Sequence, residues 1–197
     1  MEIAMEKLLI TKEQLDAQGY YAASHSIEFT GQIEIAPALG CVKFRGSLIG
    51  SMSIFAGAGS GIEAGGGIKA GDGIKAGWGI EAGGGIEAGD GIKAGSGIKA
   101  GEGIEAGSGI EAGDGIKAGE GIKAGSGIEA GWGIEAGLQI VAKTIISAKF
   151  RIFAGLCIWR LPNVKETAIT AQCIEGEVCY GKVKLLPAGI KKAATKE

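Results

Sequence analysis

A six-residue unit, Gly-Ile-(Glu or Lys)-Ala-Gly-x, repeats thirteen times without interruption from Gly61 to Leu138. Within each unit the isoleucine and the alanine lie two residues apart, with the charged residue between them. This alternation is typical of a β-strand that points Ile and Ala inward and the charge outward. The glycines on either side would permit tight corners with positive φ. Short strands joined by glycine corners predict a β-solenoid, in which each coil stacks on the one before it.

The isoleucine position of the repeat continues beyond both ends of the perfect units. Downstream it falls on Ile140, Ile146, Ile152 and Ile158. Upstream the period persists in two blocks: Ile27, Ile33 and Leu39, followed by Val42, Leu48 and Ile54. We expect small loops or bulges where the phase slips. The predicted organisation is an N-terminal cap with a short helix over residues 1–26, a solenoid over 27–159 with perfect repeats at 61–138, and a C-terminal cap with a polar tail over 160–197.

Glycine is unusually abundant, with 39 of the 197 residues, whereas proline supplies only 3. So much glycine is common in collagen and in disordered chains. Collagen needs glycine at every third residue, but here the spacing alternates between four and two residues, so collagen is excluded. An apolar residue at every sixth position indicates a packed repeat rather than disorder.

The charged position of the repeat changes sign in pairs, and between Gly79 and Gly107 it runs Glu, Glu, Lys, Lys, Glu. Stacked strands place each residue about 4.8 Å from its equivalent in the next coil, where like charges destabilise a sheet and opposite charges stabilise it. Three units per coil would stack Glu63 on Glu81, whereas two units per coil make the signs alternate throughout. We therefore predict an all-β, narrow, two-sided parallel β-solenoid with about 12 residues per coil.

The sixth residue of the unit, at the corner, provides the candidate binding residues. With two units per coil, one corner column contains Asp90, Glu102 and Asp114 in succession, with Trp78 one coil earlier, while Trp132 lies in the other column. An acidic column that no lysine neutralises predicts contact with a basic protein partner, with the tryptophans as aromatic anchors. Two alternatives stay open: wet corners tolerate like charges, and a tryptophan at a corner can simply shield an edge.

No motif for catalysis, cofactor binding or metal binding is present in the sequence. The single histidine, His25, has no nucleophile or carboxylate at a suggestive spacing, and we expect it to be structural or on the surface. Four cysteines form no zinc-binding spacing, and we expect reduced, buried thiols: Cys41, Cys157, Cys173 and Cys179. The net charge of −2 disfavours nucleic acid and membrane as partners. The start of the chain does not read as a signal peptide, so we expect a cytoplasmic, non-enzymatic protein.

Thr11 and Gln14 match a capping box and predict a short helix from about Lys12 to Gln18, which Gly19 would end. The Gly-Ile-(Glu or Lys)-Ala-Gly run together with this KLLITKEQLDAQG segment resembles small bacterial proteins encoded beside contact-dependent growth-inhibition toxins. The resemblance implies an immunity protein, which binds a delivered toxin domain, often a nuclease, and blocks it in the cytoplasm. It implies no particular toxin-binding residues.

Two other functions stay open. One is a structural scaffold that self-associates, as bacterial cytoskeletal β-helices do, and it predicts uncapped ends and filament growth. The other is an acyltransferase of the hexapeptide-repeat type, whose coils contain three units and whose base is a histidine beside the solenoid. Two units per coil and the isolated His25 disfavour the transferase.

Overall fold

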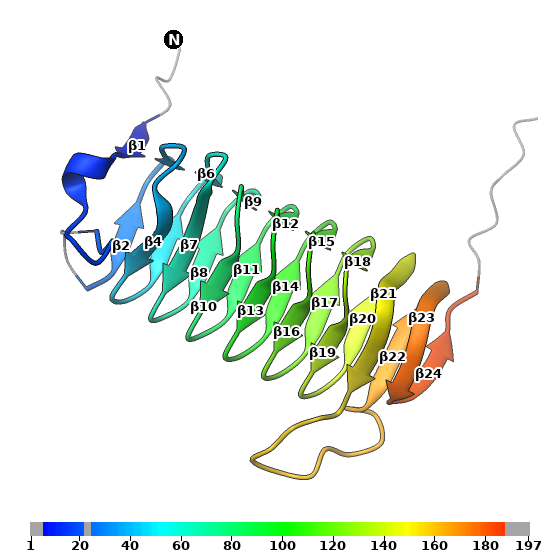
Figure 1. Ribbon diagram of the computed structural model, residues 1–197. Coiled ribbons are helices and arrows are strands. Elements are labelled where there is room, and N and C mark those ends of the chain that lie inside the picture. Colours follow the sequence, from blue (N-terminus) through cyan, green and yellow to red (C-terminus); the bar gives the residue numbers. More distant parts are fainter. Residues whose placement is uncertain (1–5, 22–24, 188–197) are drawn as a thin grey trace, which may run out of the picture.

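The chain folds into a parallel β-solenoid whose strands succeed one another along a single axis (Figure 1). The computed structural model describes residues 6–21 and 25–187. Each complete coil contributes one short strand to each of three columns, which we call the first, second and third faces. Every pairing between named strands is parallel, as the repeated passage round one axis requires.

The first face comprises β4 (Gly40–Phe44), β7 (Ser60–Ala64), β10 (Ile80–Ala82), β13 (Ile98–Ala100), β16 (Ile116–Ala118) and β19 (Ile134–Ala136). The second face comprises β2 (Ile27–Phe29), β5 (Leu48–Gly50), β8 (Ile68–Ala70), β11 (Ile86–Ala88), β14 (Ile104–Ala106), β17 (Ile122–Ala124), β20 (Ile140–Ala142), β22 (Ala168–Ala171) and β24 (Lys182–Leu185). The third face comprises β1 (Lys7–Ile10), β3 (Gln32–Ile35), β6 (Ile54–Ala56), β9 (Ile74–Ala76), β12 (Ile92–Ala94), β15 (Ile110–Ala112) and β18 (Ile128–Ala130). β21 (Ile145–Ala154) and β23 (Cys173–Tyr180) each bend from the third face onto the first.

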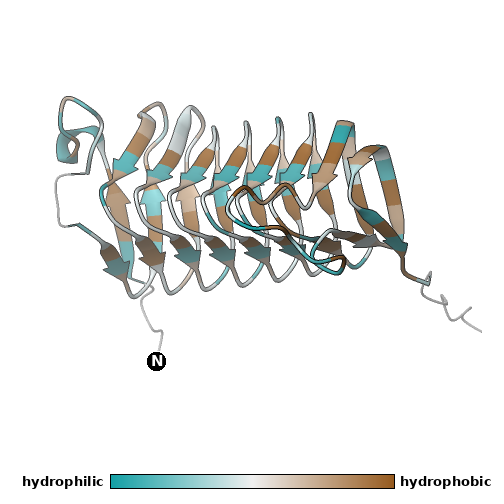
Figure 2. Ribbon diagram, turned by 90° about the horizontal axis from the view of Figure 1, so that it is seen from below, coloured by the Kyte–Doolittle hydropathy of each residue, from teal (hydrophilic) through white to brown (hydrophobic). Residues whose placement is uncertain are grey.

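The core is the stack of isoleucines and alanines that the strand alternation predicts. From Ile62 to Ile134, every isoleucine of the perfect repeats is at most 1% exposed, and the alanines two residues later are also buried. Figure 2 shows the result as alternating hydrophobic and hydrophilic bands along the strands. The prediction of an all-β parallel solenoid is therefore confirmed.

The prediction of two units per coil is wrong, because each coil of the perfect repeats contains three. Glu63 pairs in register with Glu81, and Glu81 pairs in turn with Lys99, eighteen residues further on. The signs of the charged residues repeat every four units, whereas one coil contains three units. Along each column of stacked strands, the charges therefore come as two of one sign followed by two of the other. On the first face the column is Glu63, Glu81, Lys99, Lys117 and Glu135.

Each charge in the interior of a column therefore has one neighbour of opposite sign and one of like sign. The opposite neighbours form separate ion pairs, such as Lys93–Glu111 at 2.7 Å and Lys69–Glu87 at 2.9 Å. These side chains remain about half exposed, and such pairs contribute at most about 1 kcal/mol each. Charge matching is therefore too weak to determine how many units close a coil, which explains the error.

The two glycines of each unit have a different role from the one we predicted. Within the described residues, no glycine of the perfect repeats has a positive φ. The glycine after the alanine instead lies so close to the previous coil that a side chain would not fit: a Cβ on Gly107 would lie 1.8 Å from the carbonyl oxygen of Gly89. Among the described residues, positive φ occurs only outside the perfect repeats, for example at Ala38 and Gly59, where the phase of the sequence slips.

The predicted helix over Lys12–Gln18 is wrong, because only a 3-10 turn forms at Lys12–Gln14. The backbone N–H of Thr11 does donate to the side-chain oxygen of Gln14, at 2.7 Å, as the capping box requires. Asp16 then accepts hydrogen bonds from the backbone N–H groups of Gln18 and Tyr20, at 2.9 and 2.8 Å. These bonds form a turn that competes with a helix, so the chain reverses instead of continuing.

The isoleucine phase ends earlier than predicted. Ile146 and Ile152 are buried as expected, but Ile158 is 92% exposed because the chain leaves the solenoid at Gly155, where φ is +92°. Residues 155–167 form a loop, visible as the long excursion between β21 and β22 in Figure 1. The chain then returns to build the last strands, β22, β23 and β24.

Candidate binding groove

Three units per coil rearrange the corner residues into three columns. The column between the third and first faces contains Ser60, Trp78, Ser96, Asp114, Trp132 and Phe150. Consecutive members are joined by backbone hydrogen bonds, such as Trp132 N–H to the Asp114 carbonyl at 3.2 Å. Of the five predicted binding residues, the structure thus brings together Trp78, Asp114 and Trp132.

The other two predicted residues lie elsewhere. Asp90 stacks above Asp72 in the column between the second and third faces, where its backbone N–H donates to the Asp72 carbonyl. Glu102 is in the column between the first and second faces, bonded through its backbone to Gly84 and Glu120. The continuous acidic column of Asp90, Glu102 and Asp114 does not exist, and the two tryptophans that we placed in opposite columns share one.

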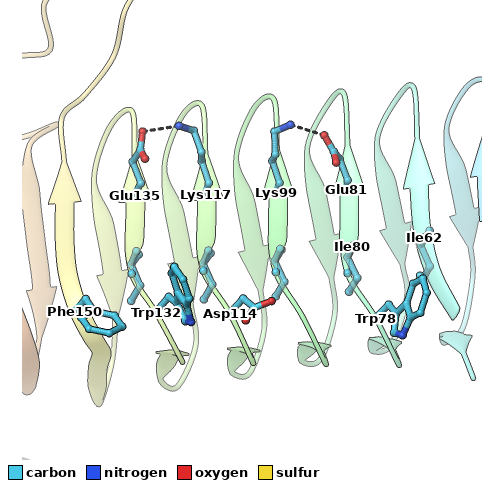
Figure 3. Close-up of a pocket in the computed structure, with 18 of the residues that line it drawn as sticks. Ile62, Trp78, Ile80, Glu81, Lys99, Asp114, Lys117, Trp132, Glu135 and Phe150 are labelled. Carbon is cyan, nitrogen blue, oxygen red and sulfur yellow. Dashed lines mark hydrogen bonds and ion pairs between the residues drawn. The ribbon is translucent and has the colours of Figure 1, made fainter. Parts of the chain in front are cut away.

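Beside the tryptophan column, a groove of about 1050 Å³ runs along the first face. Its floor is the row of glycines before the isoleucines, from Gly61 to Gly133, together with the backbone of the strands. One wall is the corner column, with Trp78 near one end and Trp132 with Phe150 near the other (Figure 3). The opposite wall is formed by two ion pairs, Glu81–Lys99 at 2.5 Å and Lys117–Glu135 at 2.7 Å.

The aromatic wall projects into solvent. Trp78 is 51% exposed and Trp132 is 64% exposed, and Phe150 packs edge-on against Trp132 with the ring centroids 5.9 Å apart. Three coils separate the tryptophans, which corresponds to about 14 Å along the axis. Asp114 lies between them, and within the described part of the chain its carboxylate has no ion-pair or hydrogen-bond partner.

This arrangement can recognise an extended ligand that carries positive charge. The faces of tryptophan rings attract Arg and Lys side chains, and a carboxylate nearby strengthens the attraction. Each ion pair of the opposite wall is neutral, and Arg151 at the Phe150 end of the groove lies 3.9 Å from Glu177, so Asp114 supplies the uncompensated charge between the two tryptophans. The glycines of the groove floor have no side chains, so a ligand can come close to the backbone of the sheet.

Two features of the molecule, one beside the groove and one away from it, were missed from the sequence. Phe150 occupies the same corner column as the tryptophans, but its unit is degenerate and the period alone did not mark it. The loop at 155–167 also exposes apolar side chains: Ile158, Trp159, Leu161 and Val164. Arg160 and Glu166 form a two-pronged ion pair across this loop at 2.7 and 2.8 Å, and the pair, with the backbone N–H of Asn163, holds the pKa of Glu166 at about 2.

The cysteines are not the buried thiols that we predicted. Cys41, Cys173 and Cys179 are exposed, Cys157 is partly exposed, and all four are free. Cys41 lies at one end of the groove, with its sulfur 3.6 Å from a carboxylate oxygen of Glu63. Although the residue as a whole is exposed, partial desolvation of its sulfur against the neighbouring chain, together with the charge of Glu63, raises the pKa of this thiol to about 11. Within residues 6–21 and 25–187, no group of three or more His, Cys, Asp or Glu side chains is arranged to hold a metal ion.

In the part of the chain that the structure describes, no helix is long and apolar enough to cross a membrane. Comparisons of the chain with protein-family models, with curated proteins and with solved structures give no match. The resemblance to toxin-immunity proteins therefore stays a prediction. What can be stated from the structure is a β-solenoid scaffold with an aromatic groove on one face.

Proposed function

We propose that this chain is a non-catalytic binding scaffold that receives an extended, basic segment of a protein partner in the groove between Trp78 and Trp132. The observation that carries the proposal is the alignment of two exposed tryptophans with an unpaired carboxylate, Asp114, between them. Tryptophan is enriched among the anchor residues of protein interfaces, and a rigid scaffold lowers the ordering cost of binding because its backbone is already fixed.

The dimensions of the groove support a peptide ligand. An extended chain advances about 3.3 Å per residue, so the roughly 14 Å between the tryptophans corresponds to about four residues. A peptide lying along the axis would place side chains i and i+4 at Trp78 and Trp132, and a basic side chain between them would reach Asp114. The open strands of the scaffold need no rearrangement to accept it.

The more specific form of the proposal is toxin immunity. An immunity protein needs a rigid, non-catalytic surface, and nuclease toxins are commonly basic. The net charge of −2 and the acidic pI of about 5.6 favour encounter with such a domain. A toxin domain encoded directly beside this gene is the partner to test, by co-purification and by inhibition of its nuclease activity at equimolar ratio.

The groove itself is tested with a fluorescein-labelled peptide of alternating Arg and Val, titrated against the full chain. Asp114→Lys and Trp78→Ala should each weaken binding by about tenfold or more, because they remove an anchor or repel the ligand. Asp90→Lys is the matched control, since it makes the same change at the same position of the repeat but on another corner. It should change affinity by less than about threefold at physiological salt, which screens distant charges.

Equal losses from Asp114→Lys and Asp90→Lys would mean that net charge alone drives binding, and would remove the groove from the proposal. No detectable binding of the peptide would remove the basic-peptide ligand. A toxin domain that remains active in the presence of the chain, while the peptide still binds, would remove immunity and leave the binding scaffold.

The alternatives differ in what now supports them. A self-associating scaffold is favoured by the uniform stacking of the coils, and it predicts filaments that pellet on sedimentation. The three-unit coil removes one objection to an acyltransferase, but His25 is exposed in the turn before β2, away from the groove residues. Binding of an acyl-coenzyme donor would revive that alternative.

A further inference from the structure

The C-terminal end of the solenoid is an open coil. β23 pairs only with β21, and β24 pairs only with β22, so their outer edges meet no other strand of the described chain. The inward side chains of this last coil, Ile174, Val178 and Val183, stack on Ile146, Ile152 and Ile169 of the coil before. Val183 is 46% exposed and Leu185 is 63% exposed, so the end of the core is also uncovered. Open edges of this kind readily pair with another chain.

At the N-terminal end β1 and β2 are also edge strands, but the segment after β1 folds over the end of the core. Leu15 and Tyr21 pack against the core, and the Tyr21 ring lies 5.9 Å from that of Phe44 in the first coil. Tyr20 also forms a parallel bridge with Lys43, which adds to the edge of the first face. A head-to-tail stack would have to displace these contacts, whereas a tail-to-tail contact would not.

The charges of the last coil are sorted by side. In the last coil, the segment on the first face is Val178–Tyr180. Glu175 and Glu177 precede this segment in the chain, and Lys182 and Lys184 follow it in β24, on the second face. The chain turns at Gly176 and Gly181, whose φ angles are +127° and +124°. The interior coils carry one outward charge on each face and pair it with a neighbouring coil, whereas the last coil places two acids on one side of the first-face segment and two lysines on the other.

This order is self-complementary. Two copies that meet end to end about a two-fold axis wind in opposite senses, so their edge strands run antiparallel. The register that places Glu177 opposite Lys182 of the second copy also places Glu175 opposite Lys184, and each pair occurs twice by symmetry. Tyr180 of each chain then lies near the axis.

The charges of the last coil are held only by long contacts or by none, and Glu175 accepts one long hydrogen bond from the Ser147 hydroxyl, at 3.4 Å. Glu177 is 72% exposed on its side chain, and its one ion-pair contact, with Arg151, is long at 3.9 Å. Lys182 and Lys184 have no ion-pair partner within the described residues. A second copy would also cover the apolar end of the core.

We propose that the chain forms a closed, tail-to-tail dimer through the antiparallel pairing of the β23–β24 edge with that of a second copy. Because both chains use the same end, the assembly is complete at two chains and does not grow into a filament. The proposal is independent of the binding groove, which lies along the first face.

The test is the mass of the full chain in solution, measured by light scattering over a hundredfold range of concentration. The native chain should approach twice the 19.8 kDa of one chain. The double variants Lys182→Glu/Lys184→Glu and Glu175→Lys/Glu177→Lys should each remain monomeric, because each makes the edge repel itself. An equimolar mixture of the two should recover the double mass, because each variant complements the other. Asp72→Lys/Asp90→Lys, which changes as many charges away from the edge, should dimerise as the native chain does.

Three results would overturn the proposal. One is a native chain that is monomeric throughout the concentration range. A version of the chain that ends at Pro187 then separates two explanations: its dimerisation would mean that residues 188–197 compete for the edge, and a monomer would mean that the edge does not pair at all. Another is dimerisation of either edge variant alone, which would place the interface elsewhere. The third is growth beyond two chains, which would indicate an open stack.

Discussion

The close approach of successive coils leads to a sharp prediction about two glycines of one turn. Gly107 follows an alanine and Gly109 precedes an isoleucine, and neither has positive φ. A Cβ at Gly107 would lie 1.8 Å from the carbonyl oxygen of Gly89, whereas one at Gly109 would lie 3.5 Å from that of Gly127. An ordinary carbon–oxygen contact is about 3.3 to 3.6 Å, so only the first site is blocked.

The cost of Gly107→Ala follows from the shift that would relieve the clash. The coils would have to separate locally by about 1.5 Å to restore an ordinary contact. That shift breaks the backbone hydrogen bonds from Gly107 to Ala88 and from Ser108 to Asp90, which are 3.0 and 3.1 Å long. Two lost bonds at about 1 kcal/mol each, with about 1 to 3 kcal/mol for overpacking, give a loss of about 3 to 5 kcal/mol. Gly109→Ala should instead be neutral or stabilise by up to about 1 kcal/mol, because alanine restricts the unfolded chain.

The assay is urea unfolding of each full-length variant, followed by far-ultraviolet circular dichroism. Gly113→Ala and Gly115→Ala repeat the comparison in the next unit, with contacts of 2.1 and 3.3 Å. Equal destabilisation by Gly107→Ala and Gly109→Ala, or a larger loss from Gly109→Ala, would refute the reasoning. It would mean that the glycines are needed for their conformation and not for the space between coils.

The remaining predictions concern the core and Cys41. Ile98→Ala should lower the free energy of unfolding by about 2 to 5 kcal/mol, because Ile98 is buried in the core. Ile158 has the same place in the six-residue period but is 92% exposed, so Ile158→Ala should lower it by less than about 0.5 kcal/mol. Equal losses in urea unfolding would contradict the exit of the chain from the solenoid at Gly155. Cys41 should be alkylated slowly by iodoacetamide at pH 8, because a pKa raised to about 11 leaves little thiolate, and the rate should rise as the pH approaches that value. Glu63→Gln should speed the reaction by removing one of the charges that disfavour the thiolate, and mass spectrometry of the Cys41 peptide would show no change if Glu63 has no influence.

The candidate site was predicted in part, and for a reason that the structure corrects. Trp78, Asp114 and Trp132 could be singled out because they occupy the sixth position of the unit, where the residue type varies most from one unit to the next. Which of them are neighbours depends on the length of a coil, so the sequence reasoning joined Asp114 to Asp90 and Glu102 and separated the tryptophans. Phe150 was missed because its unit no longer matches the repeat, although its backbone still stacks on Trp132.

The strand alternation is a local property, since inward and outward positions follow from residues two apart, and the sequence alone was enough to predict the buried isoleucine and alanine columns of a parallel solenoid. The number of units per coil is a property of the closed coil. It depends on how three strands enclose the isoleucines and on how closely glycine backbones stack, as at Gly107 and Gly89. We tried to predict the number of units per coil from the exposed charges, but each exposed ion pair contributes at most about 1 kcal/mol. Their pairing is therefore a consequence of the coil length and does not determine it. The neighbours across coils, and with them the groove and the open end, were therefore decided by the tertiary structure.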